Sequence, residues 1–313
     1  MWGGILKKMN DITKRLLELV SDLFKAPEGA YNIREDGACA GRQSSENIDI
    51  VPKSDKSGID IIVKANSKGE TVYIPACITH SNVSDLVYND FFIGENADVT
   101  IVAGCGVHTE GEESSQHNGI HRFFVSPNAH VVYLEKHIGT GDGNGKRIIN
   151  PETHIELGEN SYLEMDTVQI KGVDSTKRVS TAKLDKNAKL VIKEKIMTHG
   201  DQYAETNFDV DLNGENSGAN LISRSVAKGT SKQLFRSRIN GNTVCTGHSE
   251  CDAIIMDSGV VSAIPELTAN DMNAELIHEA SIGKIAGDQI IKLMTLGLTE
   301  AEAEAKIIEG FLK

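Results

Sequence analysis

The fold is decided by a short unit that recurs in the middle of the chain. It reads ENADVTIV at Glu95–Val102, and it returns as PNAHVVYL at Pro127–Leu134, ENSYLEM at Glu159–Met165, KNAKLVI at Lys186–Ile192 and ENSGANLI at Glu215–Ile222. The asparagines stand at positions 96, 128, 160, 187 and 216, which gives spacings of 32, 32, 27 and 29 residues. Asparagine tolerates the left-handed backbone conformation that a tight turn requires, so we expect a turn at the start of every unit.

Two positions of the unit are apolar in every copy. Three residues after the Asn stand Val99, Val131, Leu163, Leu190 and Ala219, and five residues after it stand Ile101, Tyr133, Met165, Ile192 and Leu221. A spacing of two places both positions on one face of a β-strand. Each strand therefore buries one face and needs neighbouring units to cover it, which predicts a stacked solenoid, a parallel β-helix. An ordinary β-sandwich with Asn turns is the alternative.

The sequence around the repeat supports the solenoid. From about Tyr31 to Asn270, short β-rich runs alternate with Gly, Asn and Asp and show little helical periodicity. A βαβ fold is disfavoured because it requires helical segments between the strands. Aromatic residues make up only 5% of the chain, which suits a narrow interior filled by stacked aliphatic side chains.

Both ends of the chain carry helical patterns. Near the start, apolar residues such as Leu16 and Val20 recur at spacings of three and four opposite charged residues, which predicts an amphipathic helix that caps the domain. Near the end, residues 287–296 have a helical pattern that stops at Gly297, and Thr299 with Glu302 matches a capping box. The predicted organisation is an N-terminal helix (1–30), a β-helix core (31–270) and a C-terminal helical segment (271–313).

The composition limits the partners and the compartment. Acidic residues outnumber basic ones by 45 to 32, and this net charge of −13 disfavours nucleic acid or an anionic membrane as the main partner. Charged residues interrupt the apolar stretch that a secretory signal at the start would need, and no window approaches the length of a membrane span. Five cysteines are too few for a disulfide scaffold, so we expect reduced thiols in a soluble, cytoplasmic protein.

A glycine-rich stretch at Gly139–Lys146 invites comparison with a phosphate-binding loop. The loop motif requires a glycine five positions before Gly145, where this chain has Thr140, and a Ser or Thr at the position of Arg147. We therefore expect a turn here and no nucleotide binding. Any ATP hydrolysis must come from a partner.

Four residues of metal-binding types stand close together in AGCGVHTEGEESSQHNGIH: Cys105, His108, His117 and His121. Their spacing, C-x2-H-x8-H-x3-H, matches no common structural zinc pattern. A buried cysteine with solvated loop histidines explains these residues as well as a metal site does, so both interpretations stay open.

A second group lies further along the chain. Cys245, His248 and Cys251 stand in VCTGHSECD, and His278 with Glu279 follow in AELIHEAS. A thiolate, an imidazole and a carboxylate together can ligate a transition metal or an iron–sulfur cluster. Such a mixed set would hold a cluster less tightly than four cysteines, which suits a protein that hands its cluster on. On spacing alone, structural roles for these residues are favoured over such a site.

The stretch from Glu250 to Phe311 resembles the C-terminal region of the SufB/SufD family, the scaffold subunits of the SUF iron–sulfur cluster assembly system. The matching landmarks occur in the family's order and spacing: Cys251-Asp252, Ile264-Pro265-Glu266, His278-Glu279-Ala280, Gly283, Asp288-Gln289, Gly297-Leu298 and Gly310-Phe311. The resemblance implies a right-handed parallel β-helix core flanked by helical segments, in agreement with the repeat.

The resemblance also implies roles for individual residues. Cys251 matches a B-subunit cysteine that lies between two scaffold subunits and serves cluster assembly, His278 matches the interface histidine of both branches, and Glu279 matches a carboxylate that follows it. These three residues are the implied ligands of a transient iron–sulfur cluster. Cys105 looks like the B-subunit cysteine where sulfur enters before it passes inside the β-helix. B subunits usually have a carboxylate just before the interface histidine, where the present chain has Ile277.

The resemblance further implies an assembly scaffold that is not itself an enzyme. Its implied partners are a SufC-like ABC-type ATPase docked on the C-terminal helices, a sulfur donor and apo-protein cluster acceptors. Because the chain holds both Cys251 and His278, we expect it to pair with itself as a short SufB-like homodimer, with a second SufB/SufD-type subunit as the alternative. A carbohydrate-processing β-helix and a structural, filament-forming solenoid are the rival functions.

Overall fold

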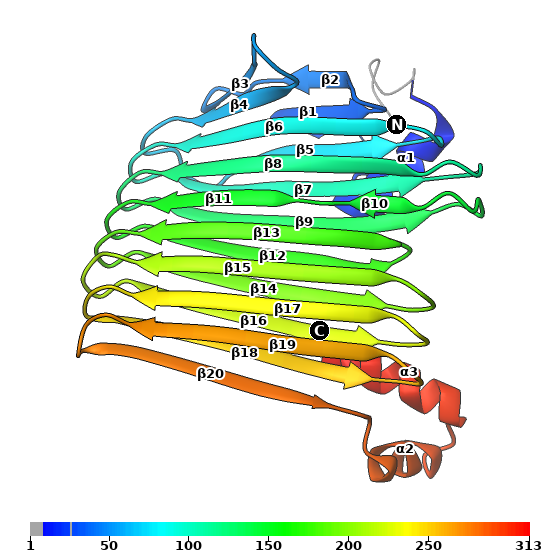
Figure 1. Ribbon diagram of the computed structural model, residues 1–313. Coiled ribbons are helices and arrows are strands. Elements are labelled where there is room, and N and C mark those ends of the chain that lie inside the picture. Colours follow the sequence, from blue (N-terminus) through cyan, green and yellow to red (C-terminus); the bar gives the residue numbers. More distant parts are fainter. Residues whose placement is uncertain (1–8, 26) are drawn as a thin grey trace.

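Two long β-sheets face each other and wind the chain into a β-solenoid of about eight turns (Figure 1). This computed structural model describes residues 9–25 and 27–313, with 58% of the chain in strands and 10% in helices. Strands of successive turns pair in parallel through the whole repeat. The parallel solenoid is confirmed, and the β-sandwich alternative is excluded because its sheets are antiparallel.

The chain alternates between the two sheets, so that each turn adds a strand to sheet A and a strand to sheet B. Sheet A contains, in spatial order, β2 (Ala38–Gln43), β1 (Ala30–Glu35), β5 (Glu70–Ile78), β7 (Asp98–His108), β9 (His130–Thr140), β12 (Tyr162–Lys171), β14 (Lys189–Thr198), β16 (Gly218–Ala227), β18 (Cys245–Ile255) and β20 (Ala274–Gly283). Sheet B contains β19 (Val260–Ala269), β17 (Lys232–Gly241), β15 (Tyr203–Leu212), β13 (Ser175–Leu184), β10 (Arg147–Ile149) with β11 (Glu152–Leu157), β8 (Ser115–Val125), β6 (Ser84–Ile93), β4 (Gly58–Val63) and β3 (Ile48–Pro52).

The repeat asparagines occupy the turns that the sequence predicts. All five have a left-handed backbone, with φ between 57° and 59°. The backbone N–H of each of the five donates to a carbonyl of the next turn. Side-chain amides add to this in the middle of the repeat: Asn160 Nδ2 donates to Asn128 Oδ1 at 3.2 Å, and Asn187 Nδ2 donates to Asn160 Oδ1 at 2.8 Å. Each Asn therefore closes its own turn and ties it to the next one.

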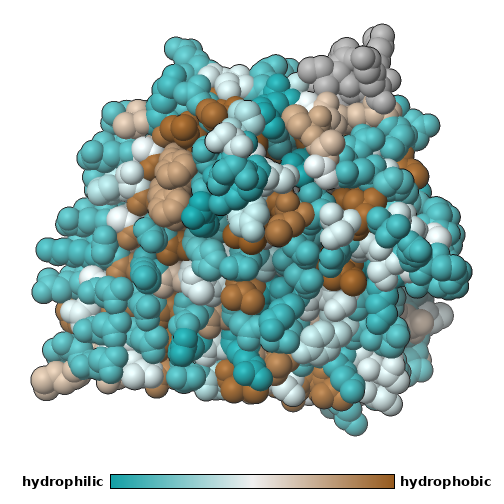
Figure 2. All heavy atoms as spheres, turned by 45° about the horizontal axis from the view of Figure 1, so that its top comes forward, coloured by the Kyte–Doolittle hydropathy of each residue, from teal (hydrophilic) through white to brown (hydrophobic). Residues whose placement is uncertain are grey.

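The two apolar positions of the unit form columns inside the solenoid. The register pairs Val99, Val131, Leu163, Leu190 and Ala219 in one column and Ile101, Tyr133, Met165, Ile192 and Leu221 in the next. All ten side chains are buried. The opposite faces of the strands point outward, and the surface in Figure 2 is largely hydrophilic with scattered apolar side chains.

The N-terminal helix α1 (Asp11–Ser21) covers a side of the solenoid and not its open end. It packs on the outer face of sheet A across β5, β7 and β9. Two glycines of β7 make this approach possible, because a Cβ added at Gly106 would lie 2.8 Å from Leu16 Cδ2 and one at Gly104 would lie 2.8 Å from the Val20 carbonyl. Residues 1–8 of the predicted helix lie outside the described residues.

The C-terminal end differs from the predicted boundary at residue 270. The segment 274–283 alternates between the two faces and adds β20 as a last rung of sheet A, so His278 lies on a strand. Helices α2 (Gly287–Met294) and α3 (Glu300–Phe311) follow, and the predicted capping box between Thr299 and Glu302 is present. Among the described residues, none of the helices combines the length and apolar character that a membrane span requires.

Substitution of Asn160 tests the contribution of the asparagine turns. Asn160→Ala removes both amide hydrogen bonds and replaces Asn by a residue that tolerates the left-handed conformation less well, so we expect it to lower the free energy of unfolding by about 1–3 kcal/mol. Asn160→Gly loses the hydrogen bonds but accepts the backbone conformation, and it should cost clearly less. Urea unfolding followed by circular dichroism measures both. Equal losses in the two variants would show that the backbone conformation contributes nothing.

Candidate functional site

A third inward position of the repeat is polar and runs along sheet A to Cys251. In register on β9, β12, β14, β16 and β18 stand Glu135, Thr167, Glu194, Ser223 and Cys251, which we call the inner polar column. Each of these side chains is at most 4% exposed. Burial of such groups costs free energy unless each forms a hydrogen bond or an ion pair. The partners of this column therefore show how the interior accommodates polar groups.

Arg178 reaches across from β13 of sheet B and joins the two carboxylates of the column. Its Nη1 lies 2.8 Å from Glu135 Oε2, and its Nε lies 3.4 Å from Glu194 Oε1. Glu194 also accepts hydrogen bonds from Thr206 at 2.8 Å and from Ser223 at 3.1 Å. A continuous set of polar contacts therefore leads from Glu135 to Ser223, which is the register neighbour of Cys251.

The two buried carboxyl groups differ in their affinity for a proton. Burial alone would raise the pKa of Glu135, but the charges of His137 and Arg178 outweigh it and hold this pKa well below its usual value. Burial raises the pKa of Glu194, although Arg178 opposes the shift. Glu135 is therefore an anion, while Glu194 takes up a proton more readily. Such perturbed groups in one enclosed place are typical of functional sites.

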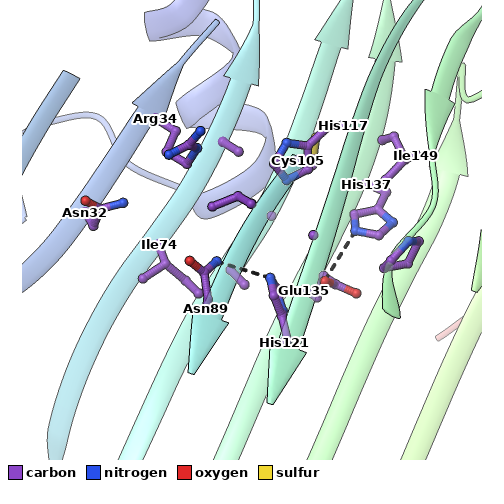
Figure 3. A pocket seen from close by; sticks show the side chains of 16 residues that line it. Asn32, Arg34, Ile74, Asn89, Cys105, His117, His121, Glu135, His137 and Ile149 are labelled. Atoms are coloured by element: carbon purple, nitrogen blue, oxygen red, sulfur yellow. Dashed lines mark hydrogen bonds and ion pairs between the residues drawn. The ribbon is translucent and has the colours of Figure 1, made fainter. Parts of the chain in front are cut away.

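Cys105 lies in the inward column next to this one and lines a small enclosed cavity. The register places it beside His137 of β9, and Figure 3 shows its side chain among those of His117, His121, Glu135 and His137. The cavity holds about 20 Å³, which is room for about one water-sized group. Burial raises the pKa of the Cys105 thiol well above its usual value, so this cysteine is a neutral thiol in the isolated chain.

The histidines around the cavity are fixed by hydrogen-bonding partners. His121 Nδ1 lies 2.9 Å from the Tyr133 hydroxyl, and burial lowers the pKa of His121 to about 4. His117 Nδ1 lies 3.0 Å from Asp85 Oδ2, and Arg34 donates to the other oxygen of that carboxylate at 2.7 Å. Burial alone would raise the pKa of Asp85, but these two partners lower it to about 2. The imidazole of His121 is thus neutral beside the thiol.

The structure places Cys251 and His278 on the inward face of adjacent strands and Glu279 on the opposite face. Cys251 points inward from β18, and burial raises the pKa of its thiol to about 12. His278 points inward from β20 opposite Ser249, which makes it a diagonal neighbour of Cys251. Its Nδ1 is buried without a hydrogen-bond partner among the described residues. Glu279 follows on the outward face, where its Oε2 lies 3.5 Å from His248 Nε2.

The remaining candidates take other positions. His108 points away from the interior and pairs with Glu110 at 2.8 Å, so within the described chain Cys105, His108, His117 and His121 do not converge on one point. Cys245 is buried and inward on β18, and all five cysteines are free. Ile277 is exposed on the outer face of β20. Gly139 and Thr140 end strand β9, and residues 141–146 form the expected turn, which hydrogen-bonds to the loop that precedes β8.

The sequence predictions missed Glu135, Arg178 and Glu194. A signal for the two glutamates exists, since the position seven residues after the repeat Asn holds Ala103, Glu135, Thr167, Glu194 and Ser223. Polar residues in four of five copies at an inward position indicate a polar interior column. Arg178 carries no comparable signal because it comes from the opposite sheet.

Comparison with known proteins gives one consistent result. Residues 79–311 match the family described as SUF system FeS cluster assembly, SufBD core domain. An iron-sulfur cluster assembly SufBD family protein of Archaeoglobus fulgidus is 32% identical over 250 residues, which cover 78% of this chain and 66% of that protein. Relatives of the same description in Methanothermobacter thermautotrophicus and Methanocaldococcus jannaschii are 28% and 27% identical, and the matches cover 78% and 86% of this chain. They cover 59% and 86% of those relatives.

Proposed function

The chain belongs to the SufBD family of the SUF iron–sulfur cluster assembly system, and on this premise we propose that it is a scaffold on which a labile cluster is built and passed on. The chain spans only about 59 to 66% of the length of the first relatives named above, so this role is proposed for the part that it shares with them. The observation that carries the proposal is the inward pair of Cys251 and His278 at the open end of a polar interior.

We assign Cys251 the central role in this chemistry. A thiolate is both a nucleophile towards a persulfide and a ligand for iron. Because the pKa of the Cys251 thiol is about 12, an incoming metal ion has to displace its proton. His278 offers an imidazole whose buried Nδ1 lacks a partner among the described residues. Glu279, which the resemblance implies as a third ligand, lies on the outer face of the same strand, so we do not place it with Cys251 and His278.

The open end of the solenoid supports pairing with a second copy. β19 and β20 are the last strands of sheets B and A, so their outer edges present unpaired backbone groups, which are a template for another chain. Exposed apolar side chains accompany these edges, among them Ile264 on β19 and Ile277 on β20. We propose that two copies, or this chain and a second SufB/SufD-type subunit, meet here and enclose Cys251 and His278.

The inner polar column supports the proposed route for sulfur. Cys105 and Cys251 point inward from the same sheet, with β9, β12, β14 and β16 between their strands. Between them lie the contacts of Glu135, Arg178 and Glu194. We propose that a sulfur donor transfers sulfur to Cys105 and that this sulfur moves inside the solenoid to Cys251. Finished clusters then pass to apo-proteins. Free thiols at all five cysteines fit the reducing cytoplasm that we propose as the location.

The C-terminal helices support docking of a SufC-like ABC-type ATPase. Helix α2 has no buried residue, and it exposes Ile291 at 60%, followed by Leu296 at 72%. An amphipathic helix with an uncovered apolar face is typical of a binding surface. We propose that the ATPase supplies the hydrolysis of ATP and that the scaffold itself is not an enzyme.

Cys251→Ser tests the central ligand. We expect anaerobic reconstitution with ferrous iron and sulfide to lose most of the cluster absorbance in this variant, because the serine hydroxyl is a poor ligand for iron in a cluster. Cys245→Ser is the matched control, since Cys245 is a buried, inward cysteine of the same strand. Full absorbance in Cys251→Ser, or an equal loss in Cys245→Ser, would contradict the assignment.

Cys105→Ser tests the route of sulfur. With inorganic sulfide the variant should assemble the cluster as well as the unchanged chain, because sulfide reaches the open end directly. With a cysteine desulfurase as the sole sulfur source, we expect at least a tenfold slower assembly. The rate of absorbance increase measures both, and equal rates with the desulfurase would exclude Cys105 as the point of entry.

Ile291→Asp tests the docking helix. A charge at this exposed apolar position should abolish co-purification with a co-expressed ABC-type ATPase, because it cannot be buried without a partner. Gln289→Glu changes the charge of an exposed position on the same helix and should retain the ATPase. Retention by both variants would show that α2 does not contact it.

A further inference from the structure

A separate group of metal-binding side chains lies on the outer face of the last two strands of sheet A. His248 and Glu250 point outward from β18, and Glu279 points outward from β20, directly opposite Glu250 in the register. One ligand atom from each residue lies within 4.8 Å of the other two. Cys251 and His278 face the interior and belong to the other side of the same strands.

The imidazole of His248 is held in the orientation that a metal ligand needs. Its Nδ1 lies 2.9 Å from the amide oxygen of Asn220 on β16. Because a carbonyl oxygen only accepts, Nδ1 carries the proton and the lone pair of Nε2 remains free. Nε2 faces Glu279 at 3.5 Å. Metal-binding histidines typically donate their other ring N–H in this way, which fixes the tautomer and the direction of the ligand atom.

Among the described residues, the two carboxylates of this group have no lysine or arginine partner, whereas other carboxylates on the outer face of sheet A have one. Elsewhere on the outer face of sheet A, Glu164 pairs with Lys193 at 2.6 Å and Asp166 pairs with Lys195 at 3.3 Å. Glu250 and Glu279 have no lysine or arginine partner among the described residues, although they stand directly opposite each other. Like charges at such a position repel each other, and a bound cation relieves this repulsion.

We propose that His248, Glu250 and Glu279 bind one divalent transition-metal ion on the outer face of β18 and β20. An imidazole with two carboxylates suits Fe²⁺, Mn²⁺, Co²⁺ and Zn²⁺ and not the all-oxygen sites of Ca²⁺ or Mg²⁺. Three protein ligands leave positions for water, so the ion exchanges readily. Only the choice of Fe²⁺ as the physiological ion rests on the proposed function. Because Glu250 directly precedes Cys251, an iron ion bound here lies on the opposite face of the strand from the Cys251 thiol.

Metal titration of the full chain tests the site. We expect isothermal titration with Co²⁺ to find one ion per chain, and anaerobic titration with Fe²⁺ to find one ion with a lower affinity. His248→Ala should weaken the affinity at least tenfold, and Asn220→Ala, which acts only through the imidazole, about 10- to 100-fold. Glu266→Gln removes an exposed carboxylate of β19 and should leave the affinity within twofold.

The outcomes separate this site from the inward pair. Cys251→Ser should keep the Co²⁺ affinity even though it loses the cluster. This expectation holds whether or not the proposed assembly function is correct. Unchanged affinity in His248→Ala, an equal loss in Glu266→Gln, or abolished Co²⁺ binding in Cys251→Ser would each overturn the outer site. Absence of Fe²⁺ binding to the anaerobic full chain, with Co²⁺ binding intact, would overturn the assignment of iron.

Discussion

Parallel hydrogen bonding in register between successive turns is the constraint on which the rest of this structure depends. Because each strand pairs with the strand one turn before and one turn after it, equal positions of the repeat form columns. A side-chain period of two then assigns every column to the interior or to the surface. Two columns are apolar and hold the sheets together. The next inward columns contain the inner polar column and Cys105, so one strand geometry supplies both the core and the candidate site.

Burying charged side chains inside the solenoid costs free energy of folding. Replacing a buried ion pair by apolar side chains of similar volume is often neutral or stabilising, and an aliphatic column at the positions of Glu135 and Glu194 would match the two columns beside it. The structure instead retains both carboxylates, Arg178 between them and hydrogen-bond donors for each. Stability alone does not account for this arrangement. The proposed role in carrying sulfur between the two inward cysteines offers a reason, since a reactive species moving there needs polar partners and exclusion of bulk water.

The last rungs of sheet A combine different ligand types on their two faces. The inward side offers the sulfur of Cys251 and the imidazole of His278, whereas the outward side offers the imidazole of His248 and two carboxylates. Soft ligands suit a cluster and hard ones suit a hydrated ferrous ion. The strand end is also where the solenoid has unpaired edges and exposed apolar side chains, so a second subunit that covers it would enclose one face and border the other.

The sequence by itself determined the turns, the apolar columns and hence the parallel solenoid, because these follow from a residue's own backbone preference and from a period of two. Through its resemblance it also singled out Cys251 and His278, which face inward from adjacent strands. Only the tertiary structure decided that Glu279 faces away from them and towards His248, and that Arg178 links Glu135 to Glu194. The physical reason is that turns of unequal length, 27 to 32 residues, leave the register between distant strands open. Hydrogen bonding between turns and packing between the two sheets fix that register, and neither is encoded in any single unit.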